Sequence, residues 1–143
     1  MKLYFAGPLF TTAERTWNAE VTAALREAGH EVFLPQEQES GLDAAGIFAT
    51  DVGGIDWADG LVAIMDGPDP DSGTSWEVGY AFGLKRWIVL IRTDIREHAG
   101  SAGDYNTMLA EAATIRIDLP AASTVQVIAR ILGALARIET GSA

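Results

Sequence analysis

The sequence contains no cysteine, and only two of its 143 residues are histidines. The missing thiols exclude a disulfide framework, a thiolate metal ligand and a cysteine nucleophile. His30 and His98 stand far apart in the chain, and their surroundings do not resemble a zinc site. We therefore expect neither a metal nor a cofactor, and the composition fits a cytoplasmic protein.

Positive charge is also scarce. Ten lysines and arginines face 20 aspartates and glutamates, which gives a formal charge of −10 and a pI near 4.4. The electrostatic field of so negative a protein repels the phosphate backbone of a nucleic acid, so we expect no nucleic-acid partner. A small ligand that is neutral or weakly charged fits better.

Long apolar runs are missing as well, so we expect no membrane partner. The opening residues, MKLYFAGPLF, resemble the start of a signal peptide, but the apolar run is short and soon meets Glu14 and Arg15. We interpret it as a first core strand. The loop that follows, Gly7 to Phe10, lacks both the dinucleotide glycine fingerprint and the phosphate-loop lysine, so neither ligand is indicated.

What the sequence does contain is a regular alternation of two patterns. Apolar runs predict five strands, at residues 2–6, 31–34, 61–65, 87–91 and 114–117. Segments with helical spacing separate and follow these runs. The alternation predicts a single domain over residues 1–143, a three-layer α/β/α sandwich with a five-stranded parallel sheet, flavodoxin-like or Rossmann-like.

We expect the chemistry of this fold in the stretch from Asp66 to Gly83, DGPDPDSGTSWEVGYAFG. A turn-forming run follows the third strand and leads into a helix that begins near Thr74, at the sheet edge where open α/β proteins bind ligands. Glu77 has two interpretations here. It completes a capping box with Thr74, or it is a catalytic carboxylate.

A second acidic segment precedes the third strand. Helical spacing covers residues 42–50, and Gly53-Gly54 weakens the pattern after it. If the next piece is a helix, Asp51 begins it and Asp59 ends it on the same stripe. We expect Asp59 to be structural, because it lies at the end of the sheet opposite the ligand crevice, whereas periodicity alone does not place Asp51.

Three sequence blocks point to a family. LYFAGPLF, DVGGIDWADGLVAIMDG and DSGTSWEVGYAFG together resemble the nucleoside 2-deoxyribosyltransferase family, over roughly residues 1–110. The resemblance implies that Glu77 is the nucleophile, that Tyr4 hydrogen-bonds and orients it, and that Asp71 and Asp51 recognise the base and transfer protons. A carboxylate suits the first role, since it can capture the cationic C1′ as a glycosyl ester.

The same resemblance implies the substrates and their binding residues. The substrates would be 2′-deoxynucleosides and free nucleobases, with Gly7, Asp51 and Asn106 binding them. Asn106 would reach the sugar hydroxyls of a neighbouring subunit's ligand, which implies a homo-oligomer. The terminal carboxylate that enters a site in the family's best-known members is not carried over, because this chain ends in a different tail.

Structural roles remain open for each of these side chains. Asp71 and Asp51 could be helix caps, Tyr4 a core aromatic residue and Asn106 a helix-start residue. Trp57 and Trp76 could flank a base, although packing or a subunit contact is the more common role of such residues.

Two alternative functions remain open too. One is hydrolysis, as in the related nucleotide N-glycosidases, which bind a 5′-phosphate. Asp71 would repel that phosphate, whereas Ser72, Thr74 and Arg15 could bind it. The other is a non-enzymatic flavodoxin-like signalling module, which the lack of a lysine after the strand at residues 114–117 disfavours.

Overall fold

The structure is a computed structural model, and it describes residues 1–38, 40–96 and 106–142. The strands are β1 (Lys2–Ala6), β2 (Glu31–Phe33), β3 (Gly60–Ile64), β4 (Trp87–Arg92) and β5 (Ile115–Asp118). The helices are α1 (Thr12–Glu27), α2 (Ala44–Trp57), α3 (Ser72–Gly83), α4 (Thr107–Ala112) and α5 (Thr124–Glu139), with a 3₁₀ turn at Pro35–Glu37. Strands and helices alternate along the chain, as the sequence predicts.

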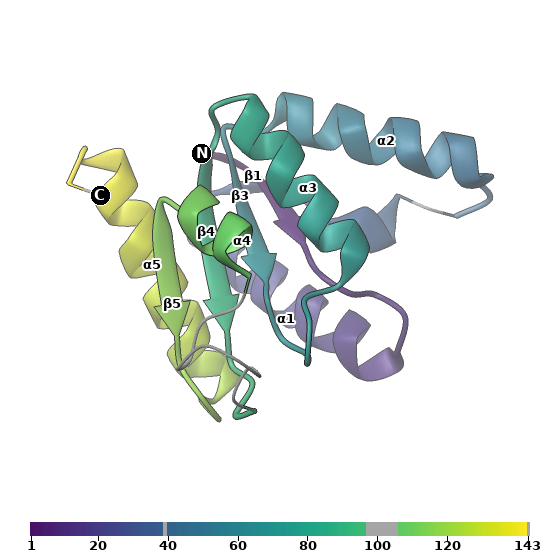
Figure 1. The fold of residues 1–143 in the computed structure, drawn as a ribbon. Helices are drawn as coiled ribbons and strands as arrows, with labels where there is room; N and C mark the ends of the chain where they lie inside the picture. The colour runs from purple at the N-terminus through teal and green to yellow at the C-terminus, as the bar shows by residue number, and fades with distance from the viewer. Residues whose placement is uncertain (39, 97–105, 143) are drawn as a thin grey trace.

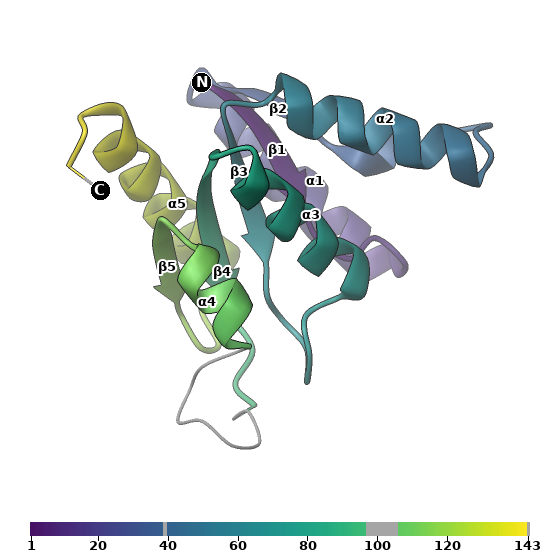
Figure 2. The ribbon, with the colours of Figure 1, turned by 45° about the horizontal axis from the view of Figure 1, so that its top comes forward.

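All four strand pairings are parallel, in the order β2-β1-β3-β4-β5 (Figures 1 and 2). The chain passes from β1 to β2 on one side and then returns to β3 on the other side of β1. Tyr4 of β1 pairs with Leu61 of β3 in this register. The carboxyl ends of β1 and β3 therefore form the switch point at which a parallel sheet opens a ligand crevice.

Two helical layers cover the sheet, with α2, α3 and α4 in front of it and α1 and α5 behind it (Figures 1 and 2). Successive residues of β1 point to opposite layers. Leu3 and Phe5 join the core under α1 and α5, whereas Tyr4 and Ala6 join the core under α2 and α3. The predicted three-layer α/β/α sandwich is confirmed. No helix in the described part of the chain is long and apolar enough to cross a membrane.

Helix α2 extends beyond the predicted segment at residues 42–50, because it continues through Gly53-Gly54, where the sequence pattern weakens. It begins at Asp43, whose carboxylate accepts a hydrogen bond from the Gly46 amide at 2.8 Å. Gly54 lies against the Phe33 ring, where a Cβ atom would come within 2.7 Å of Cε1. The glycine that weakens helix propensity is thus the residue that lets α2 approach the sheet.

The longer helix also changes where Asp51 and Asp59 lie relative to it. The prediction that Asp51 begins a helix is wrong, since Asp51 lies in the middle of α2. Asp59 falls beyond the end of α2 and does not continue its stripe. Its carboxylate accepts a hydrogen bond from the Lys2 amide at 2.9 Å, which confirms a structural role at the entry to the sheet.

Of the two interpretations of Glu77, the capping box with Thr74 is wrong. Helix α3 begins earlier, with Asp71 as its N-cap. The Asp71 carboxylate accepts from the Thr74 amide at 2.9 Å and from the Thr74 hydroxyl at 3.2 Å. The Asp71 carboxylate thus fills the N-cap role by accepting from a first-turn amide, so the helix does not need Glu77 as a cap.

Candidate active site

The site is centred on a hydrogen bond between residues 73 positions apart. The Tyr4 hydroxyl donates to Oε1 of Glu77 at 2.6 Å. The Tyr4 side chain is fully buried, whereas Glu77 on α3 is half-buried. This is the contact that the resemblance implies, and it removes the capping interpretation of Glu77.

The Tyr4 ring is held from its other side. It stacks on Phe33 of β2, with the ring centroids 5.4 Å apart and the planes 13° from parallel. Phe33 in turn lies beneath Gly54 of α2. The sheet and α2 together therefore fix the direction of the hydroxyl, and through it the orientation of the Glu77 carboxylate.

A cavity of about 470 Å³ opens beside this carboxylate, between α2 and α3. That volume suits a small-molecule ligand, for which pockets of about 300–1,000 Å³ are usual. Its lining in the described part of the chain is Ala44, Ile47, Phe48, Asp51, Val52, Gly73, Trp76 and Glu77. Asp51 and Glu77 thus meet at one cavity, each from its own helix, and the other lining side chains are apolar.

Aromatic rings form part of the cavity wall. Phe48 and Trp76 lie with their centroids 5.5 Å apart and their planes tilted by 59°. Trp76 also stacks on Tyr80 at 5.3 Å and 12°. The Tyr80 hydroxyl donates to Asp56 at 2.9 Å, and this hydrogen bond raises the pKa of Tyr80. These contacts fix the Trp76 ring, although the residue stays 47% exposed to solvent.

Sequence reasoning missed Phe48 as a site residue. Its apolar character suggests a core position, yet Phe48 is 59% exposed. A usable signal exists nonetheless, because Phe48 and Asp51 are three residues apart on one helix and therefore share a face. An acid and an aromatic ring on the same face are a plausible pair for holding a polar heterocycle.

Asp71 is not among the described cavity-lining residues, but it lies close to Gly73, which is one of them. It caps α3, as the structural interpretation expected, and the adjacent Gly73 is part of the lining. A Cβ atom on Gly73 would lie 3.1 Å from Oδ2 of Asp71, so the glycine keeps the space next to this carboxylate open. Capping and substrate contact are compatible here, and the predicted role of Asp71 with the base stays a prediction.

The two remaining predicted residues lie elsewhere. Gly7 follows β1, where a Cβ atom would lie 3.1 Å from Cγ1 of Ile64. Asn106 caps α4, and its side-chain oxygen accepts from the Met108 amide at 2.8 Å. Neither residue lines the cavity among the described residues, so their substrate-binding roles stay predictions. In the part of the chain that the structure describes, no three His, Asp or Glu side chains gather as a metal site, and His98 lies outside that part.

Comparisons with known proteins bear on this arrangement. A 2-deoxyribosyltransferase from Bacillus psychrosaccharolyticus is 26% identical, with a TM-score of 0.70 over 90% of each chain. A 2-deoxyribosyltransferase from Leishmania mexicana, 22% identical, has a TM-score of 0.65 over 80% of this chain and 88% of its own. A CMP N-glycosidase from Clostridium botulinum, 16% identical, has a TM-score of 0.69 over 92% and 97%.

No curated protein sequence gives a significant match. The family model for nucleoside 2-deoxyribosyltransferase, however, matches residues 3–126, which include the Tyr4–Glu77 pair and every residue of the cavity lining. This chain therefore belongs to the nucleoside 2-deoxyribosyltransferase family.

Proposed function

We propose that this protein transfers a 2-deoxyribosyl group from one nucleobase to another, with Glu77 as the nucleophile. The observation that carries the proposal is the 2.6 Å hydrogen bond from Tyr4 to Glu77 at the wall of a cavity that also contains Asp51. Family membership supports chemistry at an N-glycosidic bond. The site contains a carboxylate oriented by Tyr4, a second acidic side chain, Asp51, and a cavity with room for a base.

The first half-reaction forms a covalent ester. A Glu77 carboxylate oxygen bonds to C1′ as the C1′–N bond breaks, and the bonding electron pair leaves with the base. A proton from a second carboxyl group neutralises the departing ring nitrogen. Asp51 is better placed for this transfer than Asp71, because Asp51 lines the cavity while Asp71 is engaged by the start of α3.

The second half-reaction reverses these steps with a new base. A ring nitrogen of the acceptor attacks C1′ from the face that the first base left, and the ester bond breaks. The Glu77 carboxylate is restored, and the acceptor's proton returns to the acid. Two inversions give net retention at C1′.

The cavity wall favours an unphosphorylated nucleoside. Phe48 and Trp76 offer ring faces on which a nucleobase can stack, and Asp51 lies on the same helix face as Phe48. The described lining residues include no lysine, arginine or histidine that could bind a 5′-phosphate, and the Glu77 carboxylate would repel one.

A second copy of the chain would complete the site by supplying Asn106. Exposed apolar side chains on the neighbouring helices suit such a contact, since Met108 of α4 is 80% exposed and Phe82 of α3 is 59% exposed. Mixing Glu77→Ala subunits with Asn106→Ala subunits tests this arrangement. Activity returns in the mixed oligomer if the two residues serve one site from different subunits, and it stays absent if each subunit uses its own Asn106.

The experiment that tests the function compares transfer with hydrolysis. The protein is incubated with a 2′-deoxynucleoside, with and without a second free base, and the products are separated by chromatography. We expect a new deoxynucleoside when the second base is present and slow release of free deoxyribose when it is absent. Equal rates of base release under both conditions, or release only from 5′-monophosphates, would establish an N-glycosidase instead.

A further inference from the structure

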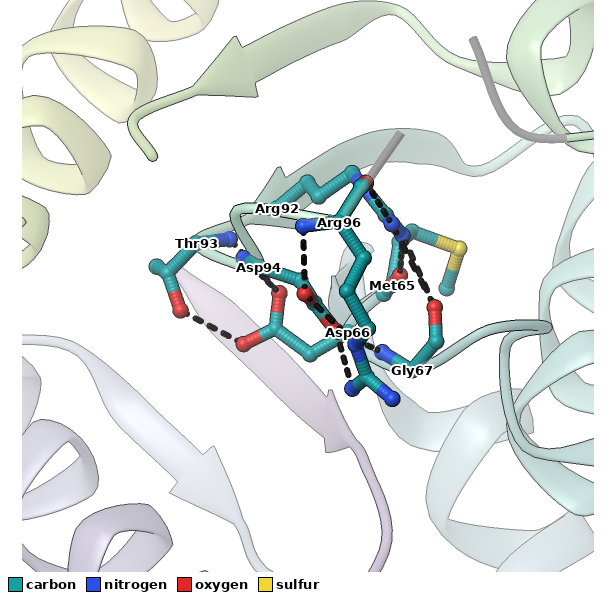
Figure 3. Close-up of polar contacts among 7 residues, drawn as sticks. All are labelled: Met65, Asp66, Gly67, Arg92, Thr93, Asp94 and Arg96. Carbon is teal, nitrogen blue, oxygen red and sulfur yellow. Dashed lines mark hydrogen bonds and ion pairs between the residues drawn. The ribbon is translucent and has the colours of Figure 1, made fainter. Parts of the chain in front are cut away.

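A network of hydrogen bonds joins the loops that follow β3 and β4, at the carboxyl edge of the sheet (Figure 3). The Asp66 carboxylate accepts three of these bonds. Two come from Thr93, from its amide at 2.6 Å and its hydroxyl at 2.5 Å, and the third comes from the Asp94 amide at 3.0 Å. One side chain after β3 thus satisfies two consecutive amides after β4.

Arg92, the last residue of β4, makes a second set of hydrogen bonds, in which its side chain donates to backbone carbonyl oxygens. Its side chain is 5% exposed, and a buried guanidinium is costly unless its donors are satisfied. It donates to the carbonyl oxygens of Met65 at 2.6 Å, Gly67 at 3.3 Å and Arg96 at 3.2 Å. A charged donor bound to the backbone of a loop fixes the path of that loop.

Gly67 joins the network through both of its backbone polar groups. Its carbonyl accepts from Arg92, and its amide donates to the Asp94 carboxylate at 2.9 Å. Arg96 binds the same carboxylate and holds the pKa of Asp94 well below its usual range, so Asp94 stays an ionised acceptor. Gly67 has φ +117°, and a Cβ atom there would meet the Asp69 carbonyl at 2.8 Å, so glycine is required.

The segment beyond Gly67 is short and stiff. It runs through Pro68, Asp69 and Pro70 to Asp71, the N-cap of α3. Proline fixes φ near −65° and restricts the residue before it, so a displacement at Gly67 is transmitted to the start of the helix. Glu77 lies six residues after the cap on the same helix.

We propose that Asp66 and Arg92 are positioning residues, which hold the β3–α3 loop so that Asp71 and Glu77 stay in register with Tyr4 and the cavity. The proposal rests on the proposed function for its catalytic consequence, and on the hydrogen bonds of Figure 3 for its mechanical part. Neither residue contacts Glu77 in the network. Both act through the loop.

The test combines hydrogen exchange with steady-state kinetics on the full-length protein. Asp66→Asn keeps the size of the side chain, but it removes the negative charge that strengthens the hydrogen bonds from the Thr93 and Asp94 amides, and it replaces the second carboxylate oxygen, which accepts from the Thr93 hydroxyl, with an NH2 group. We expect faster amide exchange in residues 66–77 with little change in α5, and a kcat for deoxyribosyl transfer that falls about 10- to 100-fold while KM changes less. Arg92→Lys keeps the charge but not the three-carbonyl geometry, so it should lose less activity than Arg92→Met.

Two further variants separate positioning from general stability. Thr93→Val removes one of the three donors to Asp66 and keeps its β-branched shape, so it should fold and lower kcat by about fivefold or less. Ile131→Ala removes buried atoms from α5, on the far side of the sheet. It should lower the melting temperature while leaving both exchange in residues 66–77 and kcat per folded molecule unchanged.

The outcomes for the two proposals are distinguishable. If wild-type protein cleaves no nucleoside, the proposed function fails, and the exchange data still decide whether Asp66 orders residues 66–77. If wild-type protein is active and Asp66→Asn lowers only the melting temperature, as Ile131→Ala does, the positioning role is overturned. Unchanged exchange in residues 66–77 overturns it as well.

Discussion

The two faces of the sheet are built differently. Under α1 and α5 the described core has fifteen buried residues, of which one is alanine, and the rest are larger aliphatic or aromatic side chains. Under α2, α3 and α4 it has twelve, of which five are alanines. Tyr4 lies on this second face and directs its hydroxyl to Glu77. Burial of large apolar side chains is the main source of stability, so the first face contributes more of it.

Helix α2 shows how the second face leaves room for a cavity. Of its residues only Gly54 and Ile55, near its carboxyl end, are fully buried. The amino-terminal part, residues 44–52, supplies five of the cavity-lining side chains. A face with small side chains, covered by a helix with few buried residues, leaves space for a ligand, whereas large side chains fill the opposite face. Stability and the site are thus divided between the two sides of one sheet.

The largest effect should come from the site face. Glu77→Gln keeps an oxygen that can accept from Tyr4, so the fold should persist, but an amide is a poor nucleophile. We expect base exchange to fall by at least about 10³-fold, which is typical of losing a covalent nucleophile. The rate of base exchange measures the activity, and the melting temperature measures the stability of the fold. Glu20→Gln, at an exposed position of α1, is the control.

Ile131→Ala should show the reverse pattern on the other face. Ile131 is fully buried in α5, so the substitution removes transfer free energy and leaves a cavity. We expect the free energy of unfolding to fall by about 2–5 kcal/mol. Urea unfolding measures this loss. A drop in kcat per folded molecule comparable to that of a site variant would contradict the division between the faces.

Trp76→Ala tests the aromatic wall of the cavity. Stacking on an aromatic side chain contributes about 1–3 kcal/mol per base, so KM for the acceptor base should rise by roughly 5- to 150-fold. Trp57→Ala is the matched control, since the Trp57 ring lies 5.4 Å from the Lys2 ammonium and is not among the described cavity-lining residues. Equal effects of the two variants would refute the stacking role of Trp76.

The smallest effect should come from the Arg26–Glu37 ion pair, whose side chains are 41% and 40% exposed. Arg26 holds the pKa of Glu37 below its usual value of 4.5, so the pair stabilises the fold above that pH and loses its effect as the pH falls further. Glu37→Gln should cost less than about 1 kcal/mol at pH 7. Unfolding at pH 7 and pH 3 measures it, and an equal cost at both would contradict this account.

The fold was predictable because it follows from local patterns. Apolar runs and helical spacing gave the order of strands and helices, and the alternation gave the parallel sheet. The helical pattern of α2 weakens at Gly53-Gly54, since each glycine costs a helix about 1 kcal/mol relative to alanine. The contact between Gly54 and Phe33 overrides that cost, and no local pattern reveals it.

The site was predictable only in part, for the same reason. Resemblance pointed to Tyr4 and Glu77, but the bond between them joins residues far apart in sequence, so the local capping pattern at Thr74 competed with it. Asp71, which the sequence also offered as a possible cap, is the residue that caps the helix. The exposure of Phe48 depends on how α2 meets α3, which periodicity does not specify.

The most direct test of the central claim is mass spectrometry of the protein quenched with acid during reaction with a 2′-deoxynucleoside and no acceptor base. The account predicts one added deoxyribosyl group, located on Glu77 by peptide sequencing and absent from Glu77→Gln. A sugar attached to a different side chain, or a product with inverted configuration at C1′ and no adduct, would contradict it.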